Sequence, residues 1–141
     1  MASLLVLDAS AALAMLLTEE EGAWVARAVE STVAVNGQLF VPAVFWYELG
    51  NGLLNAERRR RMKHDAVVDA GRLFSRLPIV THGASDPADR QRIHDLARTH
   101  DLSFSDASYL ELALRHRAAL ATCDAHLLDL KSAFPDLFPA P

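Results

Sequence analysis

Four acidic residues stand where a carboxylate can take part in chemistry: Asp8, Glu48, Asp106 and Asp124. Carboxylates that gather in one place repel one another and raise each other's pKa values unless a cation neutralises them. Ligands that are all oxygen select hard divalent cations such as Mg2+ or Mn2+, and Mg2+ binds phosphate groups alongside a few carboxylates. If the four residues meet, they therefore indicate metal-dependent attack of water on a phosphate ester.

Each acid also has a structural explanation, which the sequence leaves open. Ser103 and Asp106 have the spacing of a capping box at the start of a helix, and Asp124 can cap a helix over residues 125–130. Asp8 can serve in the same way as a cap or turn residue. Glu48 lies in an apolar helical pattern and can instead reach solvent or a nearby arginine. No single acid therefore establishes a site.

An alternation of short apolar strands with helices would bring these acids together. Strands are expected at residues 4–7, 39–41, 79–81 and 118–122, with a short edge strand near Leu137 and Phe138. Helices are expected at residues 9–17, 43–59, 66–77, 88–99 and 104–116, with another around Trp24 to Val29. This order predicts an α/β fold with a mostly parallel sheet that is covered by helices on both faces. The carboxyl ends of parallel strands meet at one edge, where all four acids can gather.

The helix expected at residues 43–59 is apolar nearly all round, so the pattern predicts that it is buried. Its apolar side chains include Phe45, Trp46, Tyr47, Leu49, Leu53 and Leu54. Gly50 and Gly52 each cost about 1 kcal/mol relative to alanine inside a helix. Their presence suggests that another backbone approaches the helix closely at these positions.

A dense basic segment lies at the expected end of the same helix: Arg58, Arg59, Arg60 and Arg61, followed by Lys63 and His64. Cations near the C-terminus of a helix interact favourably with its dipole, so a solvated face is one explanation. The alternative is contact with RNA phosphates or with an acidic segment of a partner protein.

The composition predicts one domain over residues 1–141, because 51% hydrophobic residues can supply a sizeable core. The formal net charge of −4 argues against a general basic coat for nucleic acid, so any contact with a polyanion must be local. The single cysteine permits no intramolecular disulfide, which makes the cytoplasm the expected compartment. The N-terminal segment has neither a basic start nor a long apolar run, so no export and no membrane anchor are expected.

Four short patterns carry a resemblance to a known family: Asp8-x-Ser10, Val41-Pro42 leading to Glu48-x-x-Asn51, Ser105-Asp106-Ala107 before Tyr109-Leu110, and Thr122-x-Asp124. Their order and spacing together resemble the PIN-domain ribonucleases, and closely the VapC toxins of bacterial toxin–antitoxin pairs. The resemblance covers nearly the whole chain. It implies a PIN-like fold with a five-stranded, mostly parallel sheet between helices.

The resemblance also implies roles for particular residues. Asp8, Glu48, Asp106 and Asp124 would be the catalytic acids that hold Mg2+ or Mn2+, with Asp129 as the alternative for the fourth acid. Three further residues would support the site by hydrogen bonds: Ser10, Asn51 and Thr122. The implied activity is endonucleolytic cleavage of RNA, usually in a transfer or ribosomal RNA loop, which inhibits translation and growth. The implied partners are a cognate antitoxin, the RNA and a second copy of the chain, and the homodimer also agrees with the surplus of aromatic residues at 45–47.

Other classes of protein remain as alternatives. One is a PIN-fold nuclease that processes RNA without an antitoxin, and another is a non-catalytic binding module of the same fold. A phosphatase or receiver domain also places an aspartate after its first strand. Asp8-Ala9-Ser10 lacks the second aspartate that such a site needs, and no lysine ends a later strand. The presence of all four acids favours an enzyme.

Overall fold

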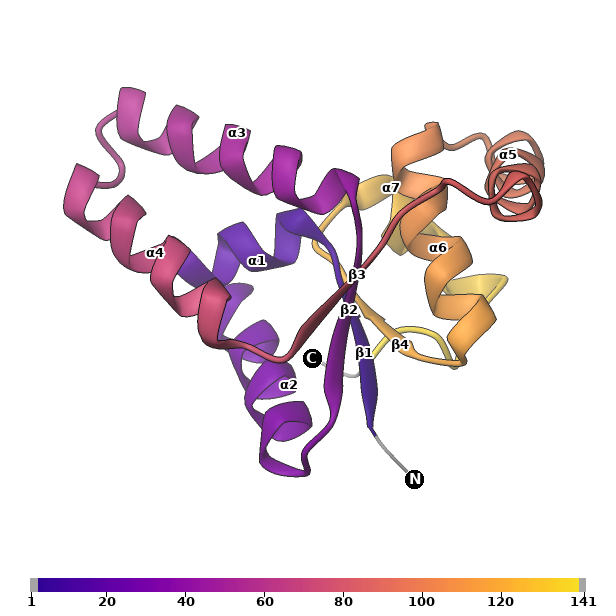
Figure 1. Ribbon diagram of the computed structural model, residues 1–141, viewed down its shortest axis with the longest axis horizontal. Helices are drawn as coiled ribbons and strands as arrows, with labels where there is room; N and C mark the ends of the chain where they lie inside the picture. Colours follow the sequence, from indigo (N-terminus) through magenta and orange to yellow (C-terminus); the bar gives the residue numbers. More distant parts are fainter. Residues whose placement is uncertain (1–2, 140–141) are drawn as a thin grey trace.

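The computed structural model describes residues 3–139 and forms a sheet with helices on both sides (Figure 1). The strands are β1 (Leu4–Leu7), β2 (Gln38–Pro42), β3 (Ile79–His82) and β4 (Ala119–Ala121). The helices are α1 (Ala9–Leu16), α2 (Gly22–Ala34), α3 (Val44–Arg58), α4 (His64–Arg76), α5 (Pro87–His100), α6 (Phe104–His116) and α7 (Ala125–Leu128), followed by a 3₁₀ turn at Asp129–Ser132. None of the helices in this part of the chain is long and apolar enough to cross a bilayer.

The sheet has the strand order β3-β2-β1-β4, and every pairing in it is parallel. Leu5 of β1 pairs with Leu39 on one side and with Ala119 on the other. Figure 1 shows α1 to α4 on one side of the sheet and α5 and α6 on the other. The predicted α/β fold class is confirmed. Such a sheet has continuous apolar strands because both of its faces are covered, and residues 5–7 are buried accordingly.

The fifth strand expected near Leu137 and Phe138 does not form, so the sheet in residues 3–139 has four strands. The backbone N–H of Leu120 donates to the carbonyl of Leu137 at 2.8 Å, and Leu137 is buried, so the segment does lie beside β4. The pairing stops there. Pro135 and Pro139 bracket the contact, and a proline has no N–H for a ladder and fixes its own φ.

The most deeply buried helix is α6, not α3. All residues from 107 to 113 are buried, because α6 lies on β1 and β2 and is covered by α5. The expectation of an all-round buried α3 is wrong: Tyr47 is 77% exposed, and Leu54 and Trp46 are 41% and 38% exposed. Only one stripe of α3 faces the core, as in an ordinary amphipathic helix. That stripe consists of Phe45, Leu49, Leu53 and Ala56.

The glycines of α3 also differ from their predicted role. A Cβ on Gly52 would lie 2.2 Å from Cδ1 of Leu13, so the nearest neighbour of this glycine is a side chain of α1 and not a backbone. Gly50 has open space around the position of a Cβ. Gly52 therefore allows α1 and α3 to pack closely, whereas nothing in the structure explains Gly50.

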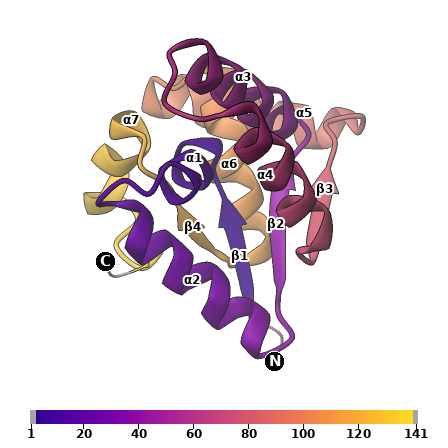
Figure 2. The same cartoon turned by 90° about the vertical axis from the view of Figure 1, so that its left-hand side faces the viewer.

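The parallel order of the sheet brings distant parts of the chain to one edge. Figure 2 shows β1 and β2 pointing in the same direction, with α1 and α3 near their carboxyl ends. Asp8 follows β1 directly, Pro42 ends β2, and Thr122 follows β4. In sheets of this kind ligands bind at the carboxyl edge of the strands.

Candidate functional site

Asp8 is the innermost of the four acids. It is 4% exposed, and it stands at the start of α1 without making a side-chain capping bond. Its Oδ2 atom accepts hydrogen bonds from Oγ1 of Thr122 at 2.6 Å and from Oγ of Ser10 at 2.7 Å. A buried carboxylate is costly unless hydrogen bonds satisfy it. Asp8 thus occupies the N-cap position of α1, but its carboxylate is held by Ser10 and Thr122 and does not cap the helix.

The same hydroxyl groups join the end of β1 to the end of β4. The backbone N–H of Cys123 donates to Oγ of Ser10 at 3.0 Å, and that of Asp124 donates to Oγ1 of Thr122 at 3.0 Å. Ser10 and Thr122, which the sequence singled out as supporting residues, thus lie together around Asp8. Each of them uses one oxygen atom to fix a side chain and a backbone group.

Glu48 is held by a tyrosine and not by an arginine. The hydroxyl of Tyr109 on α6 donates to Oε1 of Glu48 on α3 at 2.6 Å. Burial, the charge of Asp8 and the bond to Glu48 raise the pKa of Tyr109 far above its usual value, so the phenol keeps its proton and remains a donor. In the sequence Tyr109 stands out only as part of the family pattern, in which Tyr109-Leu110 follows Ser105-Asp106-Ala107, and that pattern gives it no role of its own.

Asn51 is not brought into this network. It lies one turn after Glu48 on α3, but it is exposed, and it takes no part in the side-chain hydrogen bonds that hold Asp8 and Glu48. Its predicted supporting role finds no contact in the described part of the chain.

Asp106 and Asp124 both stand at helix starts, but they differ in what the carboxylate does. Oγ of Ser103 caps α6 by accepting from the N–H of Asp106 at 3.0 Å, which is one half of the predicted capping box. A hydrogen bond with Ser103 also lowers the pKa of the Asp106 carboxylate, against the larger effect of burial. Oδ1 of Asp124 accepts from the N–H of Leu127 at 3.2 Å, so the predicted capping role of Asp124 is also confirmed. α7 is shorter than expected, because the chain continues as a 3₁₀ turn after Leu128.

The four acids are electrostatically coupled. Burial raises the pKa values of Asp8, Glu48 and Asp106, and the negative charge of Asp124 raises each of them further. The charge of Asp8 also raises the pKa values of Glu48 and Asp106. Within residues 3–139 no arginine or lysine forms an ion pair with any of the four. The structure therefore gathers negative charge at this edge and leaves it uncompensated.

This donor set suits a hard divalent cation, because all of its ligands are oxygens and their charges are unopposed. No three acidic, histidine or cysteine side chains in the described residues lie close enough to form a ready-made metal cluster. Binding of an ion by the four acids thus requires rotation of side chains. Asp124, and not the exposed Asp129, is the C-terminal acid whose charge acts on the other three.

The basic segment divides into two parts. α3 ends at Arg58, and Arg60 has a left-handed backbone with φ of 59°. All four arginines are exposed. Arg61 forms an ion pair with Glu19 through Nη2 and Oε1 at 2.6 Å, whereas Arg58, Arg59 and Arg60 form none with the described residues. Arg59 and Arg61 line a hollow of about 240 Å³ between α1 and α3, together with Ser10 of the acid network. The segment therefore lies at one end of a depression that reaches the site.

The raised pKa of Asp8 predicts a pH dependence of stability in the absence of metal. Between the unfolded and folded pKa values the folded state binds more protons, so the free energy of unfolding falls as pH rises through this range. Asp8→Asn removes this pH-dependent fall in the free energy of unfolding, because asparagine does not ionise. It keeps an oxygen that can accept hydrogen bonds from Ser10 and Thr122. We expect the stability of the variant relative to wild type to increase from about pH 4 upward.

Urea unfolding with EDTA at a series of pH values measures this difference. Glu48→Gln should show the same sign, because burial and neighbouring charges raise that pKa too. A difference between wild type and Asp8→Asn that stays constant across the series would contradict the electrostatic coupling.

Comparisons with known proteins agree with this architecture. A sequence model of the PIN domain matches residues 5–132. Protein PAE2754 from Pyrobaculum aerophilum has a crystal structure with a TM-score of 0.65 and 25% identity, covering 92% of this chain and 80% of that one. A second similar structure is that of VapC20 from Mycobacterium tuberculosis, described as a sarcin-ricin loop cleaving toxin. It has a TM-score of 0.62 and 16% identity, and the match covers 92% of this chain and 95% of VapC20. No curated protein sequence matches. The chain belongs to the PIN-domain family.

Proposed function

We propose that this chain is an endoribonuclease that depends on Mg2+ or Mn2+ and acts as the toxin of a toxin–antitoxin pair. The observation that carries the proposal is the gathering of four coupled carboxylates, without a basic partner, at the carboxyl edge of a parallel sheet. Membership of the PIN family and the likeness of fold to VapC20 support it.

In this proposal Asp8, Glu48, Asp106 and Asp124 hold the cation. The bound ion would stabilise negative charge that develops on an RNA phosphodiester under attack by water. The protein's own contribution is to position the acids. Thr122 orients Asp8 by a hydrogen bond, and Tyr109 does the same for Glu48 while keeping its proton. These bonds hold Asp8 and Glu48 at the carboxyl edge of the sheet.

The proposed substrate is a loop of transfer or ribosomal RNA, which places the reaction in the cytoplasm. Single-stranded loops suit a local site, because their unstacked bases and phosphates can enter a depression that a duplex cannot. A nuclease that processes RNA without an antitoxin, and a non-catalytic module, are the alternatives. Sequencing of RNA 5′ ends after induced expression would identify the cut. Growth arrest would separate a toxin from a processing enzyme.

The proposed protein partner is a cognate antitoxin that presents an arginine or lysine to the acids in place of the cation. The uncompensated charge at the site favours such a contact. The hollow between α1 and α3 offers Arg59 at its other end for an acidic segment of the same partner. A gene for a small protein directly upstream would support the pairing. RNA cleavage that persists in the saturated complex would contradict it.

The proposed second copy of the chain would cover the outer surface of α3. Tyr47 is 77% exposed there, next to the partly exposed Trp46 and Leu54, and exposed apolar patches of this kind mark interfaces. We expect light scattering at micromolar concentration to give the mass of two chains, and Tyr47→Glu to shift the protein toward one chain. A wild-type mass of a single chain would exclude the dimer.

Asp124→Asn separates the capping role of Asp124 from a role in metal binding. Asparagine caps a helix about as well as aspartate, so the free energy of unfolding without metal should change by no more than about 0.5 kcal/mol. Loss of the charge should reduce RNA cleavage at least about tenfold and shrink the stabilisation by added Mn2+. Cleavage across a Mn2+ titration, with melting temperatures measured alongside, tests both expectations.

The matched control is Asp129→Asn, which neutralises an exposed acid five residues later. This variant should cleave RNA like wild type. If Asp124→Asn is fully active and Asp129→Asn is not, Asp129 is the fourth acid and the site has been drawn with the wrong residue.

The basic segment gives a prediction about salt. Replacing Arg58, Arg59 and Arg60 with glutamine should weaken RNA binding and reduce the slope of log affinity against log salt by up to about 2, since each contact with a single-strand phosphate contributes about 0.7. Arg61→Gln should change the slope little, because Arg61 is paired with Glu19. Equal slopes for wild type and the triple variant would show that the segment is only a solvated face.

A further inference from the structure

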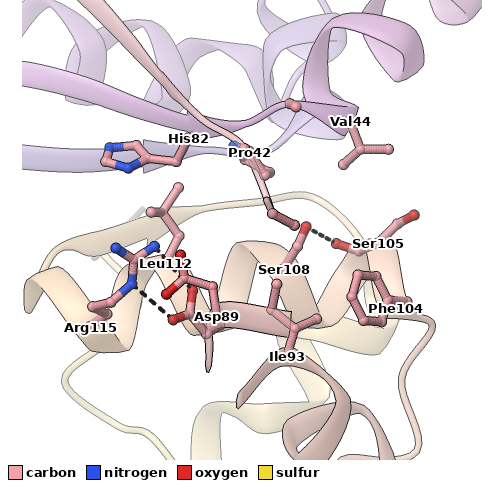
Figure 3. Close-up of a pocket in the computed structure, with 14 residues that line it drawn as sticks. Pro42, Val44, His82, Asp89, Ile93, Phe104, Ser105, Ser108, Leu112 and Arg115 are labelled. Atoms are coloured by element: carbon pink, nitrogen blue, oxygen red, sulfur yellow. Dashed lines mark hydrogen bonds and ion pairs between the residues drawn. The ribbon is translucent and has the colours of Figure 1, made fainter. Parts of the chain in front are cut away.

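A second cavity lies at the same edge of the sheet, on the other side of α6. Its volume is about 190 Å³. Figure 3 shows residues of the β2–α3 junction and the end of β3 on one side of it, and residues of α5 and α6 on the other. Its apolar walls come from Pro42, Val44, Ile93, Phe104 and Leu112. Phe104 is 44% exposed, so its ring is accessible at the entrance.

The cavity and the acid site share their supporting elements. Asp106 and Tyr109 lie on the face of α6 that serves the acids, whereas Ser105 and Ser108 lie on the face that lines the cavity. Ser105 directly precedes Asp106 in the chain. On α3, Val44 of the cavity is one turn before Glu48, which places the two side chains on the same face. A ligand at the acids therefore needs to extend only past the start of α6 to enter the cavity.

The lining of the cavity carries no free positive charge among the described residues. Nε of Arg115 donates to Oε1 of Glu111 at 2.9 Å, and Glu111 is 3% exposed. Asp89, also in the lining, is paired with Arg92. Burial, the neighbouring His116 and the charge of Arg115 lower the pKa of His82, so its ring stays neutral at physiological pH. A phosphate would find no cation here, which makes an uncharged ligand the better occupant.

We propose that this cavity binds one nucleobase of an RNA strand whose phosphodiester lies at the four acids. The inference rests on the proposed ribonuclease function and adds to it a determinant of sequence specificity. The cavity is smaller than the roughly 300 to 1,000 Å³ of sites for drug-sized ligands, so it suits a single ring system. Apolar walls with an accessible aromatic ring suit stacking. The hydroxyl of Ser105 offers a partner for the polar edge of a base, whereas that of Ser108 donates to the carbonyl of Ser105 and can only accept.

A protein side chain is a weaker candidate for the occupant. A polynucleotide that presents a phosphodiester to the acids carries a base on each neighbouring nucleotide, and bases of unpaired strands are readily splayed out. The cavity lies beside the start of α6, next to Asp106, so a base on a nucleotide that neighbours the phosphodiester can enter it. Stacking on Phe104 then fixes which phosphodiester of the strand lies at the acids.

The test uses single-stranded RNA decamers of mixed sequence and versions of each that lack one base. Binding is measured by fluorescence anisotropy with Ca2+, another hard cation that oxygen ligands bind, and cleavage of the same RNAs with Mn2+ is measured separately. For wild type we expect removal of the base at one position to weaken binding about tenfold, within the range for loss of one stacked base. Removal at other positions should weaken it less.

Two variants remove the proposed site in different ways. Phe104→Ala deletes the stacking ring, and Ala43→Phe fills the cavity from the exposed start of α3. In both, binding of the intact RNA should fall to the level of the RNA that lacks the critical base, and the position effect should vanish. Leu73→Ala truncates an equally exposed apolar side chain on α4 and should keep the wild-type pattern.

Four other results would each contradict the proposed base site. RNA that wild type cleaves but binds without a position effect excludes the base site and leaves the ribonuclease proposal standing. A position effect that survives in both variants places the base elsewhere. Variants that lose affinity for an antitoxin, but not for RNA, assign the cavity to protein docking. If wild type neither binds nor cleaves RNA, both proposals fail together.

Discussion

The structure depends on one buried carboxylate. Asp8 follows the interior strand β1 and is almost fully buried, and the negative charge of Asp124 acts on it. Two hydroxyl groups satisfy its Oδ2 atom, yet burial and, to a smaller extent, the charge of Asp124 raise the pKa of Asp8, so its ionisation opposes folding. A buried carboxylate that opposes folding is expected at a functional site, where the negative charge is needed for function and not for stability.

One helix organises the rest of the carboxyl edge. α6 is buried through its middle, so its position is fixed by the sheet beneath it and by α5 above it. Its first turn carries Asp106, and its second turn carries Tyr109, which holds Glu48 of α3. A rigid helix places such groups more exactly than a loop. The two faces of α6 thereby link the acids on one side to the cavity behind Ser105 and Ser108 on the other.

Sequence reasoning reached the fold because short apolar runs and helical periodicity are local signals, and their alternation along the chain implies a parallel sheet. The acids at Asp8 and Asp124 could be placed at one edge because both follow apolar strands. The bond between Tyr109 and Glu48 could not be foreseen, since it joins residues 61 positions apart. The burial of α3 was overestimated because aromatic content was read as burial, whereas Tyr47 faces outward. The fifth strand follows from the family resemblance and from the apolar residues Leu137 and Phe138, whereas the structure has four strands, and Pro135 and Pro139 limit pairing at this segment.

Capping and metal binding are compatible roles for a helix-terminal aspartate. Oδ1 of Asp124 accepts from the N–H of Leu127, and this bond fixes the carboxylate without using all of its acceptor capacity. The charge of Asp124 meanwhile acts on Asp8, Glu48 and Asp106, so the cap does not withdraw it from the cluster. A capping pattern in the sequence therefore gives no argument against a role of the same aspartate in metal binding. A cation that relieves the repulsion, whether a metal ion or a basic side chain of a partner, therefore stabilises the folded state when it binds.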